Sequence, residues 1–236
     1  MAPYVPFFNA LFREGKSTKE IDLGMDLDQF KKTDKKLREE GNRLTFIYYG
    51  FGSYQAAWHE SSKPQSWLVT EDFDELKSHE KKNEKEGFRL QYLNTQGDLF
   101  MAIWHPGSGN QFWDVNISFN DLKAKDEEFR SLGLMLMCLN NYGGNYSAFW
   151  QPGTRKYDWI VTDKEDQFVA FKEKNEKRGL LGVSYGGAEF CAVFHEEKGD
   201  QRFTGALKEK DFKKRSEELF KENFHIVDMH LTFGTP

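Results

Sequence analysis

The chain has 236 residues, with 33 basic and 38 acidic side chains and a net charge of −5. It contains no apolar run near the about 18 to 20 residues of a membrane-spanning helix, and it lacks the basic block typical of nucleic-acid binding. Its 22 Phe, 6 Trp and 9 Tyr predict a folded protein with an aromatic core. The two cysteines, Cys138 and Cys191, are too few for a disulfide framework. We therefore expect a cytoplasmic protein, or a secreted one if a leader has been trimmed.

The first predicted elements in chain order are a short strand, a helix and two further strands. The strand contains Ala10 and Phe12, and the charged segment around Phe30 is typical of a helix with a narrow buried stripe. Gly41 follows this segment, where a left-handed helix C-cap favours glycine. RLTFIYY (43–49) then predicts a strand, and the turn GFGS leads into another strand that carries Trp58.

The same order of elements recurs along the rest of the chain. A glycine follows each of the first four predicted helices at intervals of 46 residues, namely at Gly41, Gly87, Gly133 and Gly179. An Ala-x-aromatic strand ends in Trp58, Trp104, Trp150 and Phe194, and an aromatic residue opens each following unit at Trp67, Trp113, Trp159 and Phe203. The buried stripe of the helices contains Phe30, Leu76, Leu122, Phe168 and Phe212. The glycine, the Ala-x-aromatic strand and the opening aromatic residue, which we call the anchors, recur together and identify an internal repeat.

The two ends of the chain predict that the repeat closes on itself. The units are about 21–66, 67–112, 113–158, 159–202 and 203–236 plus 1–20. The last unit lacks its Ala-x-aromatic strand, and Ala10-Leu11-Phe12-Arg13 supplies that form at the other terminus. We expect an α+β fold with one domain over 1–236. It would be a closed five-fold pseudo-symmetric α/β propeller of strand-helix-strand-strand units, in which the N-terminal strand completes the last unit.

The anchors resemble tandem-repeat modules of many bacterial proteins, which carry Gly-aromatic-Arg-Leu, then Ala-Ala-x-Trp and another Trp. Residues 87–90, 102–104 and Trp113 have this form, whereas the fourth unit departs from it at Gly182 and Phe194. The resemblance implies little about activity, because such modules are mostly accessory or unassigned. The five-fold layout is also similar to the pentein propellers, which include guanidine-modifying enzymes and a ribosome-associated factor; this similarity is one of layout alone.

One column of polar residues follows the third-strand aromatic in each unit. Its members are Arg13, His59, His105, Gln151 and His195. Strand alternation places them on the face opposite the Ala/aromatic pair, so they would meet at one mouth if that face points to the ring axis. They would then bind a ligand through hydrogen bonds. Three histidines also fit zinc, although Arg13 would repel a dication. Alternatively, each side chain is solvated at a strand end.

The repeated aromatic residues have two interpretations. Side chains at fixed phase, such as Trp58, Trp104 and Trp150, are typical of a core that holds helix to sheet. Tyr48 and Phe149 lie among further aromatics in two hairpins, and ligand pockets are largely apolar and aromatic. We therefore include all five with the polar column as candidate ligand-binding residues.

Sequence signals for catalysis are few. Gly182-Val-Ser184-Tyr-Gly186 spells a nucleophile-elbow pattern but lies in a predicted hairpin rather than in a strand-turn-helix. Cys138 aligns with core positions, and Cys191 lies four residues before His195. No phosphate loop, metalloprotease motif or calcium loop occurs. We expect no catalytic residues and no metal site.

These observations predict a non-catalytic binding protein that holds a largely apolar or conjugated small molecule, for example a carotenoid or lipid, against aromatic side chains. The cofactor would be such an apolar chromophore or lipid, and the partner a small molecule rather than nucleic acid, with a homo-oligomer as a further expectation. A multivalent carbohydrate-binding lectin, a pentein-like cysteine enzyme and a scaffold for a partner protein are the alternatives.

Overall fold

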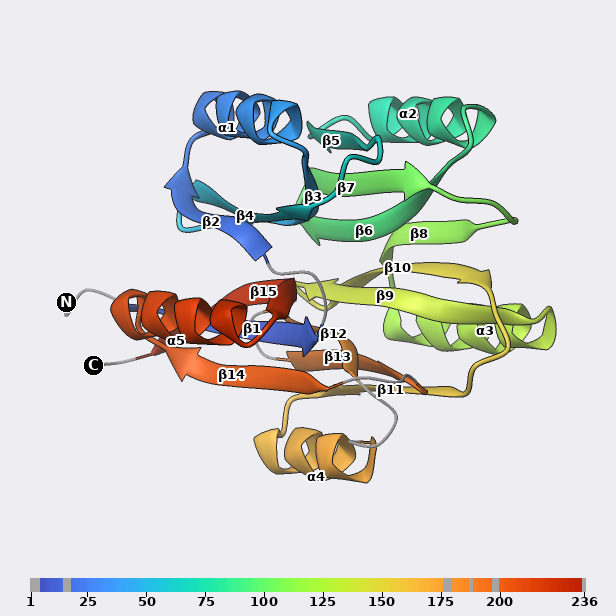
Figure 1. Ribbon diagram of the computed structural model, residues 1–236. Coiled ribbons are helices and arrows are strands. Elements are labelled where there is room, and N and C mark those ends of the chain that lie inside the picture. The colour runs from blue at the N-terminus through green and yellow to red at the C-terminus, as the bar shows by residue number, and fades with distance from the viewer. Residues whose placement is uncertain (1–4, 15–17, 176–179, 187–188, 197–199, 235–236) are drawn as a thin grey trace. The chain divides into compact units, whose positions relative to one another are not determined.

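The computed structural model describes residues 5–14, 18–175, 180–186, 189–196 and 200–234 (Figure 1). The chain forms two compact units, one of residues 1–62 with 199–236 and the other of residues 63–198. Together they contain five three-stranded antiparallel sheets and five helices over the described residues, so the fold is α+β as predicted. In the described part of the chain, none of these sheets closes on itself and no helix is long and apolar enough to cross a membrane.

The unit of residues 1–62 and 199–236 contains two sheets. The first has the order β2-β4-β3 and includes helix α1, with bounds β2 Thr18–Met25, α1 Leu27–Glu39, β3 Asn42–Gly50 and β4 Ser53–Glu60. The second has the order β14-β1-β15 and includes helix α5, with bounds β1 Val5–Glu14, β14 Gln201–Leu207, α5 Glu209–Lys221 and β15 Phe224–Gly234. In each sheet the central strand is the one that carries the Ala-x-aromatic pattern.

The unit of residues 63–198 contains three sheets of the same design. The first is β5-β7-β6, with β5 Ser66–Thr70, α2 Phe73–Lys85, β6 Phe88–Gln96 and β7 Leu99–Pro106. The second is β8-β10-β9, with β8 Phe112–Ile117, α3 Phe119–Ser131, β9 Leu134–Tyr142 and β10 Asn145–Pro152. The third is β11-β13-β12, with β11 Tyr157–Thr162, α4 Glu165–Asn175, β12 Leu180–Gly186 and β13 Glu189–His195.

The N-terminal strand completes the last unit of the repeat, as the sequence predicts. Strand β1 lies between β14 and β15, and Phe12 is the register partner of Ile226. Ala10 donates its backbone N–H to Thr204 Oγ1 at 3.0 Å, which ties β1 to β14. Phe12 is fully buried, and its ring lies 6.5 Å from that of Phe212 on α5. Residues from opposite ends of the chain therefore share one sheet and one core.

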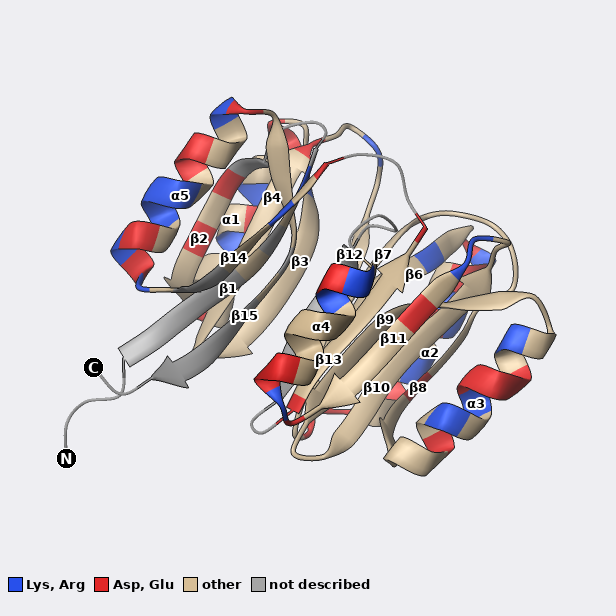
Figure 2. Ribbon diagram, turned by 90° about the horizontal axis from the view of Figure 1, so that it is seen from below, with Lys and Arg blue, Asp and Glu red and all other residues tan. Residues whose placement is uncertain are grey.

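The helices follow the predicted pattern of one buried stripe and a charged outer face. Phe30, Leu76, Leu122, Phe168 and Phe212 are all buried. Acidic and basic residues band α3 and α5, whereas β9 and β10 carry none (Figure 2). Burial of the apolar stripe stabilises these helices against the sheets, because their charged residues contribute little to a core.

The glycines after the helices adopt the left-handed conformation that the sequence predicts for helix C-caps. Gly41, Gly87 and Gly133 have φ angles of 80°, 79° and 76°. A residue with a side chain would be strained at such an angle. Asn223, with φ 64°, holds the equivalent place after α5, and asparagine tolerates this region better than most residues. Gly179 lies outside the described residues.

Each central strand pairs with the strand that follows the helix through a register shift at the same repeat position. The shifts fall between Leu44 and Phe46 in β3, Leu90 and Tyr92 in β6, Leu136 and Cys138 in β9, Leu180 and Gly182 in β12, and Ile226 and Asp228 in β15. A bulge of this kind adds one unpaired residue and bends the strand. It also interrupts the ladder, so backbone carbonyls beside the bulge become accessible to side chains.

Within the unit of residues 63–198, neighbouring sheets share their cores. Phe149 of β10 packs with Leu90 and Leu93 of β6, and Val193 of β13 packs with Leu136 and Leu139 of β9. The face opposite the helix therefore contacts the preceding sheet. Helix packing on one face and sheet packing on the other leave the central strands almost completely buried.

Candidate functional site

The tryptophans of the central strands are buried and bonded to helix carboxylates. Trp58 donates from Nε1 to Asp34 at 3.1 Å, Trp150 donates likewise to Asp126 at 3.1 Å, and Trp104 donates to Glu80. All three indole rings are fully buried. These candidate ligand residues thus join each sheet to its helix.

The polar partner on the helix changes together with the strand aromatic. The units with tryptophan have Asp34, Glu80 and Asp126 at one helix position. The remaining two units have phenylalanine, Phe194 or Phe12, and the equivalent helix residue is Lys172 or Ser216. A buried carboxylate is costly without a donor, so it occurs here only where an indole N–H reaches it. This signal lies in the sequence at a fixed spacing of 24 residues, but the sequence analysis missed it.

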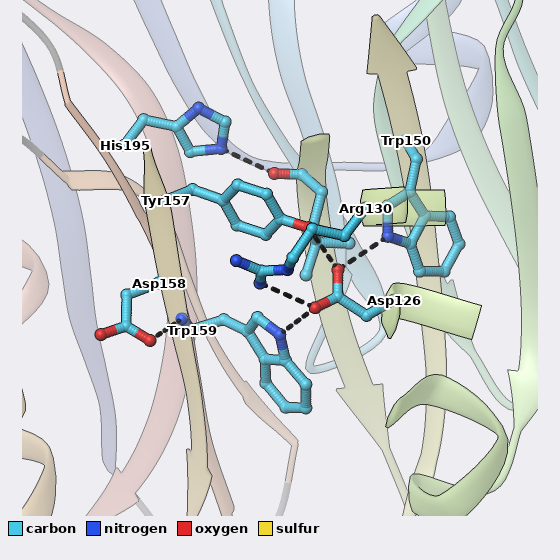
Figure 3. A network of polar contacts seen from close by, with 8 residues as sticks. Asp126, Arg130, Trp150, Tyr157, Asp158, Trp159 and His195 are labelled. Carbon is cyan, nitrogen blue, oxygen red and sulfur yellow. Dashed lines mark hydrogen bonds and ion pairs between the residues drawn. The ribbon is translucent and has the colours of Figure 1, made fainter. Parts of the chain in front are cut away.

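The carboxylate of Asp126 accepts hydrogen bonds from four side chains, and we call these residues the Asp126 network (Figure 3). Trp150 Nε1 and the Tyr157 hydroxyl donate to Oδ1 at 3.1 and 2.6 Å. Trp159 Nε1 and Arg130 donate to Oδ2 at 2.8 and 2.9 Å. The Arg130 guanidinium also lies 3.9 Å from the centre of the Tyr157 ring. The network joins α3 and β10 to β11, the first strand of the next unit.

The number of donors decides the direction of the carboxylate pKa. Burial acts to raise the pKa of Asp126, but hydrogen bonds from Tyr157, Arg130, Trp159 and Trp150 outweigh it, and the pKa lies below its usual value. Burial likewise raises the pKa of Glu80, and the bond from Trp104 offsets it only in part. Asp126 is therefore held as a compensated anion.

Two members of the predicted polar column bind backbone carbonyls beside the bulges. Gln151 Nε2 donates to the Leu90 carbonyl at 2.7 Å, and His195 Nε2 lies 2.6 Å from the Leu136 carbonyl. In each case the carbonyl belongs to the preceding sheet. His195 is fully buried and its ring stacks on Tyr157 at 5.6 Å. These two side chains connect neighbouring sheets, a role that the sequence analysis did not consider.

Each of the other three column residues lies opposite a second basic residue on the neighbouring strand. His105 is the register partner of Arg89, His59 of Arg43, and Arg13 of His225. Directly opposite residues of an antiparallel pair project from the same face of the sheet. The column therefore comes with a companion position on the neighbouring strand, which the sequence analysis did not identify.

Four of these residues meet within the unit of residues 1–62 and 199–236, and we call them the basic cluster: Arg13, Arg43, His59 and His225. Strand β15 packs beside β3, and the rings of His59 and His225 lie 6.3 Å apart. Phe12 and Trp58 contact α5 and α1 respectively. Since side chains alternate along a strand, Arg13 and His59 lie on the sheet faces opposite these helices.

The basic cluster carries positive charge that is partly withdrawn from water. Burial lowers the pKa of the Arg43 guanidinium. Burial, followed by the positive charge of Arg13, lowers the pKa of His225, and a hydrogen bond with the Arg13 backbone opposes this shift in part. An anion beside these groups would reverse both effects, because an opposite charge favours the protonated form.

Arg43 and Arg89 occupy the same repeat position but have different partners. Arg89 donates to the carbonyls of Gly109 at 2.6 Å, Phe88 at 2.7 Å and Glu84 at 3.2 Å. Arg43 makes no hydrogen bond or ion pair with any residue that the structure describes, and its Nε is buried. Backbone carbonyls thus accept hydrogen bonds from Arg89, whereas no described residue accepts one from the equivalent Arg43.

The remaining candidate residues are aromatic. Tyr48 is half-buried on β3 opposite Gln55, and this pair lies on the same face of the sheet as Arg43 and His59. Phe149 is buried between two sheets. Tyr48 is thus the aromatic candidate on the same sheet face as part of the basic cluster.

The cysteines and Ser184 are the candidate nucleophiles of the catalytic alternative. Cys191 is fully buried, and Cys138 donates its thiol to the Leu93 carbonyl at 3.4 Å. Ser184 lies within strand β12, not in a strand-turn-helix. No cluster of metal-ligating side chains occurs among the described residues.

No protein-family model, curated protein or solved structure matches this chain.

Proposed function

We propose that the protein is a non-catalytic binding protein for a small molecule with a largely apolar or conjugated body, such as a carotenoid or lipid. The polar end of the molecule lies at the basic cluster, and Tyr48 contributes aromatic surface. The observation that carries this proposal is the meeting of Arg43 and His225 with Arg13 and His59 on four strands. Stability alone would favour the carbonyl partners that Arg89 has.

The proposal includes one closed ring of five units over the whole chain. Two observations support it: β1 completes the sheet of the last unit, and consecutive sheets of residues 63–198 pack through the face opposite their helices. Small-angle X-ray scattering tests this arrangement. A ring predicts the compact dimensions of one domain, and an elongated particle would contradict it.

Native mass spectrometry and absorbance spectroscopy of protein purified from its source test the binding function. We expect an added mass that is lost on denaturation in organic solvent, with visible or near-ultraviolet absorbance if the ligand is conjugated. Protein that carries no added mass, and that takes up none from a lipid extract of the same cells, would contradict the proposal.

The lectin alternative has one specific observation in its favour. Phe73 meets Trp113 and Phe119 meets Trp159, each pair with ring centroids 6.1 Å apart and nearly perpendicular planes. Phe73 and Phe119 are exposed. Sugars stack on such aromatic faces, and two equivalent sites would add avidity. A glycan array with the wild type and with Trp113→Ala tests this function. A lectin should bind glycans, and the substitution should weaken that binding.

The enzyme alternative has less support, because a cysteine nucleophile needs an exposed thiol of lowered pKa beside a base. Cys191 is fully buried, and the Cys138 thiol donates a hydrogen bond to a backbone carbonyl. Alkylation kinetics on the native protein test this alternative. Rapid modification of either thiol near neutral pH would support it.

A further inference from the structure

We propose that the basic cluster binds a phosphate group, carried at the polar end of the ligand. This inference rests on the proposed binding function and adds the chemical class of the group that is recognised. It depends on the arrangement of Arg13, Arg43, His59 and His225, which four strands bring together.

Strand pairing brings the four side chains of the basic cluster together in two cross-strand pairs. Arg13 faces His225 across β1 and β15, and Arg43 faces His59 across β3 and β4. Contact between the His59 and His225 rings, 6.3 Å apart, joins the two pairs. A protonated imidazole directly opposite a guanidinium destabilises a sheet, and Arg13 accordingly helps to lower the pKa of His225.

The described part of the chain does not balance the charge of Arg43. Arg43 has no acidic partner there, and its Nε, like Nδ1 of His225, is buried without a hydrogen bond to a described residue. Arg89, its equivalent in the next unit, donates three hydrogen bonds to carbonyls from Nε and Nη1. A buried donor without an acceptor is costly, and an anionic oxygen would remove that cost.

The number of charges favours phosphate over carboxylate. Arg13 and Arg43 are permanent cations, and the two imidazoles can each take up a proton beside an anion. A phosphate monoester carries nearly two negative charges at neutral pH and three acceptor oxygens. A carboxylate offers one charge and two oxygens, so it would match fewer of these donors than a phosphate does.

Titration calorimetry of the full chain with inorganic phosphate tests the inference, because the headgroup alone should bind. Arg43→Met should weaken phosphate affinity by about tenfold or more, since hydrogen bonds to charged groups are strong. Arg43→Lys keeps the charge but loses the planar fork, and we expect an intermediate affinity. Lys36→Met, on the outer face of α1, removes one exposed positive charge and should leave affinity unchanged.

Acetate at matched ionic strength is the second arm of the experiment. Phosphate binding that is at least about tenfold tighter than acetate binding supports the phosphate assignment. Equal affinities would overturn it. Equal phosphate affinity in wild type and Arg43→Met, or no heat of binding at millimolar phosphate, would overturn the site itself.

The outcomes separate this inference from the proposed function. A purified protein that carries an apolar molecule but shows no phosphate binding retains the binding function and loses the phosphate assignment. Phosphate binding that depends on Arg43, in a protein that carries and takes up no apolar molecule, retains the site and contradicts the proposed ligand.

Discussion

The Asp126 network and the basic cluster are two places where the repeat withdraws charge from water, and they treat that charge in opposite ways. Asp126 receives four hydrogen bonds from its own chain. Arg43 receives no compensating partner from the described residues. Charge withdrawn from water that the chain satisfies itself contributes to stability, whereas the half-buried charge of Arg43, which no described residue compensates, points to a ligand.

The largest expected effect comes from removing the charge of Asp126. Asp126→Asn leaves several buried donors without a carboxylate, and we expect the free energy of unfolding to fall by about 3 to 5 kcal/mol. Urea denaturation measures this loss. Glu80→Gln, at the same repeat position with one indole donor, should cost about 1 kcal/mol or less. Equal losses in the two variants would contradict the role that we assign to the number of donors.

A double-mutant cycle tests the pairing of tryptophan with a helix carboxylate. Trp104→Phe removes the indole donor from Glu80 and should destabilise the protein by about 2 to 3 kcal/mol. Glu80→Ser then reproduces the pairing of Phe12 with Ser216 and should restore about 1 kcal/mol. Thermal and urea denaturation of both single variants and the double variant give the coupling free energy. A coupling near zero would show that the two positions vary independently.

Arg43 and Arg89 provide a matched test with opposite expected signs. In buffer without polyvalent anions, Arg43→Met should raise the free energy of unfolding by about 0.5 to 1 kcal/mol, because it removes a positive charge that no described residue compensates. Arg89→Met should lower it by about 1 kcal/mol, since three bonds to carbonyls are lost. Loss of stability in both variants would indicate that Arg43 serves the fold.

The smallest expected effect is on the pH dependence of stability. The pKa of His225 is lowered in the folded protein, so the unfolded chain binds the proton first as the pH falls. The contribution of His225 to stability is therefore complete above an unfolded pKa of about 6.5 and declines as the pH falls from there towards the folded pKa. Asp126, whose pKa is lowered, loses its contribution only below about pH 4.

The pKa of His79 is also lowered, by burial first and then by Lys82, so His79 contributes to the same pH dependence. Comparison of the wild type with His225→Phe isolates the contribution of His225. Denaturation between pH 7.5 and 5.5 should show a flatter profile in the variant. An identical slope in both proteins would contradict the lowered pKa of His225.

The repeat and its ends were predictable because they depend on local chemistry at fixed spacing. The left-handed conformation of Gly41, Gly87 and Gly133 was predicted from their positions directly after helices. The pairing of Phe12 with Ile226 was predicted because the last unit lacks one strand. The polar column was predictable as a set, but its partners were not. The carbonyl that Gln151 reaches lies beside a bulge 61 residues earlier, and neither the bulge nor that distance has a sequence motif.

The basic cluster was half predictable for the same reason. Arg13 and His59 share a repeat position, so the sequence places them in one column. Arg43 and His225 lie on different strands and become relevant only through cross-strand register. Strand pairing is a tertiary feature, and a single sequence without a structure does not fix it.

The pKa of His225 with and without phosphate, from NMR titration of the imidazole resonances, tests most directly whether the basic cluster is a binding site. In the free protein we expect the pKa to lie below the ordinary value of about 6.5, and saturating phosphate should raise it by bringing a negative charge against the ring. His79 provides the internal reference and should not move. A His225 pKa that stays unchanged in saturating phosphate would contradict the account.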